Sequence, residues 1–145
     1  MDSHVAALGG TIGDALLEPH RSYLPLVRPM LEGDLIKGMA HITGGGITDN
    51  LPRVLSSSVV ASVDLSRWQV PPIFQWLMEQ GRVPLDDMLR TFNMGVGLVI
   101  VTAAAKADHV MEGLSARGGR DARIIGEIVP GQGPAVTYTG SPLLA

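Results

Sequence analysis

The sequence predicts an α+β protein, a single layered domain in which a mixed β-sheet is flanked by helices. Segments rich in β-branched residues alternate with segments of helical spacing, which indicates that strands and helices share one core. The 145 residues are enough for such a core, and 46% apolar with 17% charged residues is typical of a folded globule. Cysteine is absent, which excludes disulfides, Cys-based zinc sites and thiol nucleophiles.

The first half of the chain yields five expectations. Residues 1–13 are glycine-rich and lack a periodic pattern, so we expect a flexible tail or linker remnant there. Apolar residues recur at helical spacing over 21–31, which predicts a helical segment in spite of two prolines. The apolar stretch 36–42 predicts a strand, and residues 47–55 predict a helix. Residues 59–65 are rich in β-branched side chains and predict another strand.

The second half begins with two expected helices. Residues 71–80 start at prolines, carry apolar side chains on one side and stop at a glycine. Residues 84–92 place two aspartates in the first turn, where the helix dipole favours negative charge. Residues 96–102 are almost wholly apolar and predict a buried strand. The remaining elements are expected to be a helix at 103–117 and strands at 122–129 and 135–139.

We expect one domain over residues 14–140, followed by a C-terminal tail at 141–145. The N-terminus lacks the basic region and the apolar stretch of a secretory signal, and no apolar run approaches the roughly 20 residues that span a bilayer. We therefore expect a cytoplasmic protein without a membrane partner. The net charge is −3 and the 11 basic residues are scattered, so we also expect no nucleic-acid partner.

The most informative segment spans residues 41–53, where Gly44, Gly45 and Gly46 join an expected strand to an expected helix. Such a junction builds a nest of free backbone N–H groups at the positive end of a helix, which favours an anion and most often a phosphate. Three glycines are entropically costly, and that cost is tolerated where a ligand or another backbone comes very close. A tight turn that merely requires glycine is the alternative.

Residues beside these glycines are further candidates. Thr43 would add a hydroxyl donor and Arg53 a charge clamp for a phosphate. His41 would contact a ligand or shuttle a proton near neutral pH, or it is a hydrogen-bonded structural residue. The other three histidines do not form a metal-ligand spacing with it, so we expect no metal site.

A second glycine element lies at residues 91–97. Asn93 offers both a donor and an acceptor, and glycines such as Gly95 permit the close approach of a ligand. The alternative is a loop whose glycines serve packing.

Four segments in register resemble phosphoribosylformylglycinamidine cyclo-ligase, the aminoimidazole ribonucleotide synthetase of purine biosynthesis. They are residues 40–46 (AHITGGG), 50–55 (NLPRVL), 72–77 (PIFQWL) with Trp68, and 88–97 (MLRTFNMGVG). The resemblance covers only the C-terminal half of that enzyme, and it implies the fold of the superfamily's C-terminal domain. Residues 14–23 resemble the segment that leads into this domain. There Arg21 and Tyr23 are kept, and His20 stands where the family commonly has threonine.

The resemblance implies an ATP-dependent ring closure that converts formylglycinamidine ribonucleotide to aminoimidazole ribonucleotide. ATP phosphorylates the amide oxygen, the amine nitrogen attacks, and phosphate leaves. The resemblance adds Asn50 and Arg21 to the residues expected to bind the phosphorylated ribonucleotide substrate. ATP and Mg²⁺ are cofactors of the full-length enzyme, whose N-terminal domain supplies most of their ligands and has no counterpart here.

The chain alone is therefore expected to bind no cofactor tightly and to be inactive or nearly so. Its expected partners are the substrate, the N-terminal ATP-binding domain and, as a possibility, further copies of itself. Two alternatives stay open. One is the phosphate-binding domain of another superfamily member, of the amidotransferase, selenophosphate synthetase, thiamine-monophosphate kinase or hydrogenase maturation type. The other is a non-catalytic assembly module that associates through an apolar face.

Overall fold

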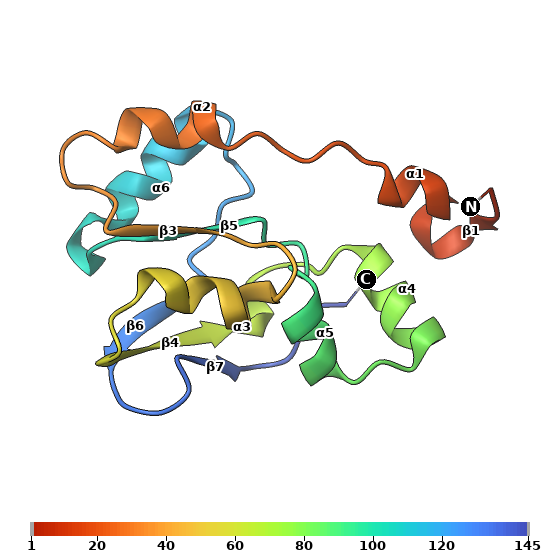
Figure 1. Cartoon of the computed structure of the whole chain (residues 1–145). Coiled ribbons are helices and arrows are strands. Elements are labelled where there is room, and N and C mark those ends of the chain that lie inside the picture. The colour runs from red at the N-terminus through yellow and green to blue at the C-terminus, as the bar shows by residue number, and fades with distance from the viewer. Residues whose placement is uncertain (1, 145) are drawn as a thin grey trace.

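The computed structural model describes residues 2–144 and arranges their main strands in two small sheets (Figure 1). β3 (Gly38–His41) pairs antiparallel with β5 (Leu98–Val101). β4 (Val59–Asp64) is the centre of a three-stranded sheet, with β6 (Gly126–Pro130) antiparallel on one side and β7 (Val136–Thr139) parallel on the other. The expected mixed sheet is thus the three-stranded one, and within the described residues β3 and β5 form a separate pair.

Six α-helices accompany these strands in the described part of the chain. They are α1 (Ile12–Leu16), α2 (Leu24–Val27), α3 (Gly46–Asn50), α4 (Pro72–Gly81), α5 (Leu85–Thr91) and α6 (Ala107–Ala116). Short 3₁₀ segments extend three of them, at Arg28–Met30, Leu51–Val54 and Ala104–Lys106, and others lie at Ala6–Leu8 and Leu65–Arg67.

Proline explains why α2 and α3 are shorter than the helices expected at residues 21–31 and 47–55. Pro29 and Pro52 lie inside the 3₁₀ segments that follow α2 and α3. A proline lacks the backbone N–H that an α-helix needs for its i→i−4 bond, and its ring crowds the preceding turn. The chain therefore continues in a tighter 3₁₀ geometry, which tolerates short runs.

The N-terminal segment contains more local structure than its composition predicts. β1 (His4–Val5) and β2 (Gly10–Thr11) form a small antiparallel hairpin. Thr11 then caps α1 through a reciprocal bond with Asp14, the arrangement called a capping box. Figure 1 shows this unit standing to one side of the body, joined to α2 by an extended segment. The boundary of the domain at residue 14 remains a prediction.

The largest buried cluster joins both sheets. It contains Ala40 and Val99 from the β3–β5 pair, Ala61 and Val63 from β4, and Ile47 at the start of α3. A second cluster lies beneath α4 and α5, around the fully buried Met88. A third joins α2 and α6, which lie together on the other side of β3 and β5 in Figure 1. α3 is thus packed against both sheets and is fixed relative to the end of β3.

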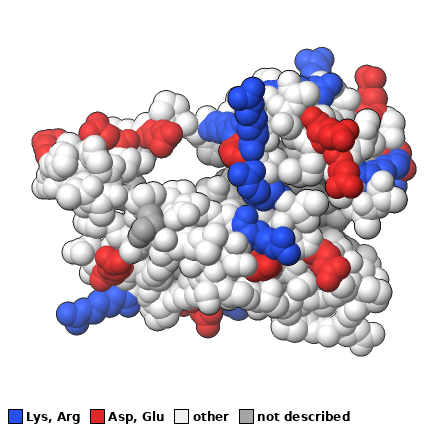
Figure 2. All heavy atoms as spheres, turned by 180° about the vertical axis from the view of Figure 1, so that it is seen from behind, with Lys and Arg blue, Asp and Glu red and all other residues white. Residues whose placement is uncertain are grey.

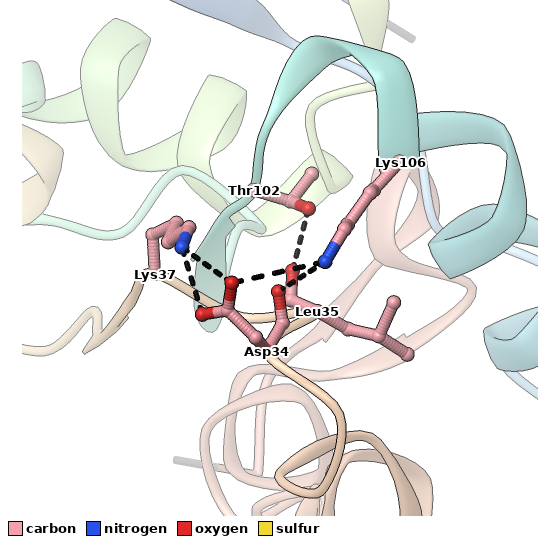
Figure 3. Close-up of polar contacts among 5 residues, drawn as sticks. All are labelled: Asp34, Leu35, Lys37, Thr102 and Lys106. Carbon is pink, nitrogen blue, oxygen red and sulfur yellow. Dashed lines mark hydrogen bonds and ion pairs between the residues drawn. The ribbon is translucent and has the colours of Figure 1, made fainter.

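A polar clamp fixes the chain just before β3 (Figure 3). The Lys37 ammonium donates to the Asp34 carboxylate at 2.7 Å, and the Lys106 ammonium donates to the Asp34 carbonyl at 2.9 Å. The Thr102 hydroxyl donates to the Leu35 carbonyl at 2.6 Å. The hydrogen bond and the charge of Lys37, together with the charge of Lys106, lower the pKa of Asp34. The segment before β3 is therefore held by hydrogen bonds to Thr102, which follows β5, and to Lys106, which precedes α6.

The face opposite that of Figure 1 carries both signs of charge. Figure 2 shows basic side chains in a short file, with acidic side chains beside them and wide uncharged areas elsewhere. No helix among residues 2–144 combines the length and the apolar character needed to traverse a lipid bilayer.

Candidate functional site

A pocket of about 240 Å³ lies where β3 ends. Its wall combines Thr43 and Gly44, which follow β3, with Asn93, which follows α5. The fold therefore brings together residues from the two glycine-containing motifs of the sequence. The rest of the wall consists of His20, Ile42, Phe74, Thr91 and Phe92.

The turn between β3 and α3 requires glycine at two of its three positions. Gly45 and Gly46 have φ values of 96° and 58°, in the left-handed region that disfavours other residues. A Cβ atom on Gly46 would collide with the carbonyl oxygens of Leu89 and Phe92, at the end of α5. Gly46 is therefore required for two reasons: the turn needs its positive φ, and the backbone of α5 approaches too closely for a side chain.

Gly44 differs from its two neighbours. Its φ is not in the left-handed region, and a Cβ atom there would meet nothing within 4 Å. The turn itself therefore does not demand glycine at this position, although Gly44 is the glycine that lines the pocket. A side chain at this position would extend into free space beside the pocket, so a glycine here leaves that space open.

The structure leaves fewer free backbone N–H groups in this loop than the three that the sequence predicts. The Gly46 N–H donates to the Thr43 carbonyl at 3.0 Å and is not available to a ligand. The N–H groups of Gly44 and Gly45 have no hydrogen-bond partner among residues 2–144. Asp49 lies beside Gly45, so a carboxylate adjoins the loop on that side. Two amides, rather than three, are therefore left without a hydrogen-bond partner in the described residues, and of the two residues only Gly44 lines the pocket.

Asn50 holds this loop from beneath. Its side chain is 4% exposed, and its Nδ2 donates to the carbonyls of Gly44 at 3.1 Å and Gly46 at 2.9 Å. The residue does not line the pocket. Its position supports a role in shaping the loop, where the sequence predicted a contact with substrate.

A second polar contact fixes α3 against α5. The Thr48 hydroxyl donates to the Leu89 carbonyl at 3.1 Å and lies 2.8 Å from the Tyr138 hydroxyl of β7. Burial raises the pKa of Tyr138. The loop and the end of α5, which both line the pocket, are thus connected through side chains as well as through Gly46.

The Asn93 loop is self-supporting. Asn93 Oδ1 accepts a hydrogen bond from the Gly95 N–H at 3.0 Å, which closes a local turn. Gly95 has a φ of 93°, and a Cβ there would collide with the Pro71 ring. The packing alternative therefore accounts for Gly95, whereas Asn93 faces the pocket.

His41 lies beside the pocket rather than on its wall. Its Nε2 is 3.1 Å from Nε2 of His20, and the two rings meet edge to face with centroids 4.9 Å apart. His20 itself lines the pocket. No local pattern in the sequence signals this pair, because the two histidines are far apart in the chain and have no metal-ligand spacing.

The two expected arginines lie away from this pocket. The Arg21 guanidinium pairs with the Asp121 carboxylate and donates to the Gly118 carbonyl at 3.2 Å. Arg53 is exposed on the 3₁₀ segment after α3 and does not line the pocket. The structure therefore does not bring either guanidinium to Gly44.

Arg21 instead borders a second, larger hollow of about 840 Å³. This hollow lies between residues 95–102, which include β5, and residues 119–128, which lead into β6. Its wall is mainly apolar. Within the described residues, no group of three or more His, Asp or Glu side chains is arranged to hold a metal ion.

The sequence matches the family described as AIR synthase related protein, C-terminal domain, over residues 1–139. It is 42% identical over 131 residues to a phosphoribosylformylglycinamidine cyclo-ligase of Alkaliphilus metalliredigens, covering 90% of this chain and 38% of that protein. A Neisseria gonorrhoeae protein of the same name is 48% identical over 110 residues, covering 76% and 32%. The bifunctional purine biosynthetic protein ADE1 of Schizosaccharomyces pombe is 45% identical over 107 residues, covering 74% and 14%.

The fold is similar to that of solved structures as well. A crystal structure of E. coli HypE, a hydrogenase maturation protein, superposes with a TM-score of 0.63 at 21% identity, covering 94% of this chain and 44% of that one. A second E. coli HypE structure gives a TM-score of 0.64 at 23% identity, covering 81% and 35%. The chain thus spans less than half of HypE, and 32–38% of the two bacterial cyclo-ligases.

Proposed function

Because the chain belongs to the AIR synthase related protein C-terminal domain family, we propose that it is the substrate-side domain of an ATP-dependent cyclo-ligase. The reaction would convert formylglycinamidine ribonucleotide to aminoimidazole ribonucleotide in purine biosynthesis. The two bacterial cyclo-ligases described above are 42% and 48% identical to it, against 21–23% for HypE, which favours the cyclo-ligase over a hydrogenase maturation role. The phosphate-binding domain of another superfamily member is the second candidate.

The observation that carries the proposal is the glycine at position 44. The turn does not require it, yet it borders the pocket and leaves its own amide and that of Gly45 free. Backbone N–H groups bind phosphate oxygens and stabilise a growing negative charge without reorganising. Thr43 would add its hydroxyl, and Asn93 its amide, from the facing loop. At about 240 Å³ the pocket is smaller than usual sites for whole drug-sized ligands, which suits one phosphate group of a larger substrate.

The described residues contain no ready-made cage for a magnesium ion. Mg²⁺ takes carboxylate and other oxygen ligands, and no group of three or more His, Asp or Glu side chains in residues 2–144 is arranged to hold a metal ion. On the family resemblance, we assign ATP and Mg²⁺ to an N-terminal domain of the kind that the full-length cyclo-ligases have. The present domain would hold and orient the phosphorylated ribonucleotide. A cytoplasmic location, an absence of nucleic-acid partners and self-association remain predictions.

Titration of the purified chain with inorganic phosphate, followed by calorimetry, tests this proposal. A Gly44→Leu variant should keep its melting temperature, because the added side chain enters open space. Its phosphate affinity should fall about tenfold or more, the equivalent of one or two lost charge-assisted hydrogen bonds at about 1.5–3 kcal/mol each.

The matched control is Ala105→Leu, which adds a leucine at an exposed position before α6. This variant should bind phosphate as the unmodified chain does. If the unmodified chain binds no phosphate, or if Gly44→Leu binds it equally well, the pocket is not the phosphate site.

A further inference from the structure

The hydrogen bonds of His20 determine where its proton lies. His20 Nδ1 is 2.8 Å from the main-chain carbonyl oxygen of Arg21. A carbonyl oxygen only accepts, so Nδ1 must carry the hydrogen and donate it. In a neutral imidazole the other nitrogen then has a free lone pair. Nε2 of His20, in a ring that lines the pocket, is therefore a proton acceptor.

His41 takes the opposite neutral form, with its hydrogen on Nε2. Its Nε2 lies 3.1 Å from the lone pair on Nε2 of His20. A hydrogen bond between these two atoms requires that His41 Nε2 carries the hydrogen and that His41 Nδ1 does not. The two rings are thus a directional pair, in which His41 donates to His20 and His20 donates to the main chain.

We propose that His20 is the proton-binding residue of the pocket, and that it takes up one proton when the pocket binds a doubly charged oxyanion. The inference rests on the proposed phosphate site and adds to it His20, which was not among the site residues expected from the sequence. The ligand class is a tetrahedral oxyanion such as the phosphate group of a nucleotide. A protonated imidazole at the wall supplies the positive charge that neither Arg21 nor Arg53 brings to Gly44.

The proton count is simple. A proton from solvent binds the free Nδ1 of His41, and the hydrogen on Nε2 of His41 passes to Nε2 of His20. The His41 ring is again neutral, now with its hydrogen on Nδ1, and the His20 ring carries one positive charge. Both rings are exposed, so a proton also reaches His20 without this relay. In either case the pair gains one proton and no other group is altered.

Few charged or ionisable side chains lie near His20. Tyr23 lies with its ring centroid 5.8 Å away, and Arg21 is occupied by Asp121. The lining residues from α4 and from the end of α5 are uncharged. Asp49 adjoins the loop at Gly45. The proton acceptors that the hydrogen bonds identify at this site are therefore the two imidazole rings.

Sulfate is the suitable probe, because it stays doubly charged across this pH range whereas phosphate does not. Calorimetric titration of the chain with sulfate should show affinity about tenfold higher at pH 5.5 than at pH 8.0. At pH 7, titrations in buffers of different ionisation enthalpy should report the uptake of up to one proton for each sulfate bound.

A His20→Gln variant keeps a polar amide but cannot take a proton. Only His41 can then take a proton, so the sulfate affinity should change much less between the two pH values and the proton uptake should be smaller than in the unmodified chain. The matched control, His109→Gln, changes an exposed histidine of α6 and should behave as the unmodified chain does. If His20→Gln retains the full pH dependence of the unmodified chain, the proposal is overturned.

A second measurement needs no variant. Nitrogen-15 NMR of the imidazole rings should show His20 with its hydrogen on Nδ1 and His41 with its hydrogen on Nε2 at pH 8. The reverse forms would refute the assignment even if sulfate binds. Failure of the phosphate site itself gives a different result, in which the unmodified chain binds neither phosphate nor sulfate while the NMR assignment still holds.

Discussion

The three consecutive glycines have different roles: two are required by the backbone geometry of the turn, and the third borders the pocket. Gly45 and Gly46 meet the demands of the turn, and Gly46 also allows α5 to approach within backbone contact. Gly44 meets neither demand and borders the pocket instead. Stability and binding should therefore respond to substitutions at different glycines.

Gly46→Ala should destabilise the chain by about 2–5 kcal/mol, because a Cβ is disfavoured at positive φ and would collide with two carbonyl oxygens. The measurement is urea unfolding followed by tryptophan fluorescence. Gly44→Ala is the matched control and should stay within about 0.5 kcal/mol of the unmodified chain. Equal losses at the two positions would show that both glycines serve the turn.

At the scale of elements, α3 is held between β7 and α5 by the Thr48 and Tyr138 hydroxyls. Removing the phenol oxygen in Tyr138→Phe should cost about 0.5–1.5 kcal/mol at pH 7, the usual net value of one hydrogen bond. Chemical unfolding at pH 7 measures this loss.

Alkaline pH should reduce the difference in stability between the unmodified chain and Tyr138→Phe. The pKa of Tyr138 is raised from 10.0, chiefly by burial, so an unfolded chain ionises this residue first as the pH rises above 10. The unmodified chain should consequently lose stability faster than Tyr138→Phe between pH 9 and 11. Parallel curves would mean that Tyr138 is not buried as described.

The Asp34 clamp before β3 should make the protein acid-sensitive in a defined range. The pKa of Asp34 lies below 3.8, its ordinary value, so the clamp contributes fully above that pH and is lost as the pH falls through the lowered pKa. Asp34→Asn tolerates the φ of 57° and carries no charge. Its stability should fall less between pH 5 and 2 than that of the unmodified chain.

Salt provides the control for this prediction. Asp34 is exposed, so its interaction with Lys37 should be screened at about 1 M salt, where the Debye length is about 3 Å. The difference between the acid profiles of the two chains should then shrink. A difference that survives high salt would point to a cause other than the ion pairs.

Elements with a strong local pattern were predicted nearly as found. The expected helices at 71–80 and 84–92 correspond to α4 and α5, and the expected strand at 59–65 corresponds to β4. The strand expected at 122–129 begins only at Gly126, where the chain starts to pair with β4. Pairing partners are set by contacts between distant segments, so the division into two sheets has no local signature.

At the scale of the whole molecule, the chain spans about a third of the two bacterial cyclo-ligases it matches, and no group of three or more His, Asp or Glu side chains in its described part is arranged to hold a metal ion. Purified chain supplied with formylglycinamidine ribonucleotide, ATP and Mg²⁺ should therefore form no measurable product. A full-length cyclo-ligase under the same conditions is the control. Turnover by the chain at a comparable rate would contradict its assignment as the substrate-side part of the enzyme.

The candidate site could be predicted from the sequence only where its residues stand in a recognisable local motif. Thr43, Gly44 and Asn93 stand in motifs that local chemistry makes conspicuous, and the fold places them around one pocket. Arg21 and Arg53 have the right charge, but the path of the chain directs them elsewhere. The His20–His41 contact depends on the course of the segment between α1 and α2, which no periodic pattern specifies.

The pairing of β3 with β5 has a consequence for how the chain folds. Their hydrogen bonds join strands on either side of residues 42–97, a stretch that contains α3, β4, α4 and α5. The entropy of closing that long loop must be lost before the pair gains stability. Folding should accordingly be slower than in a helical bundle of equal size.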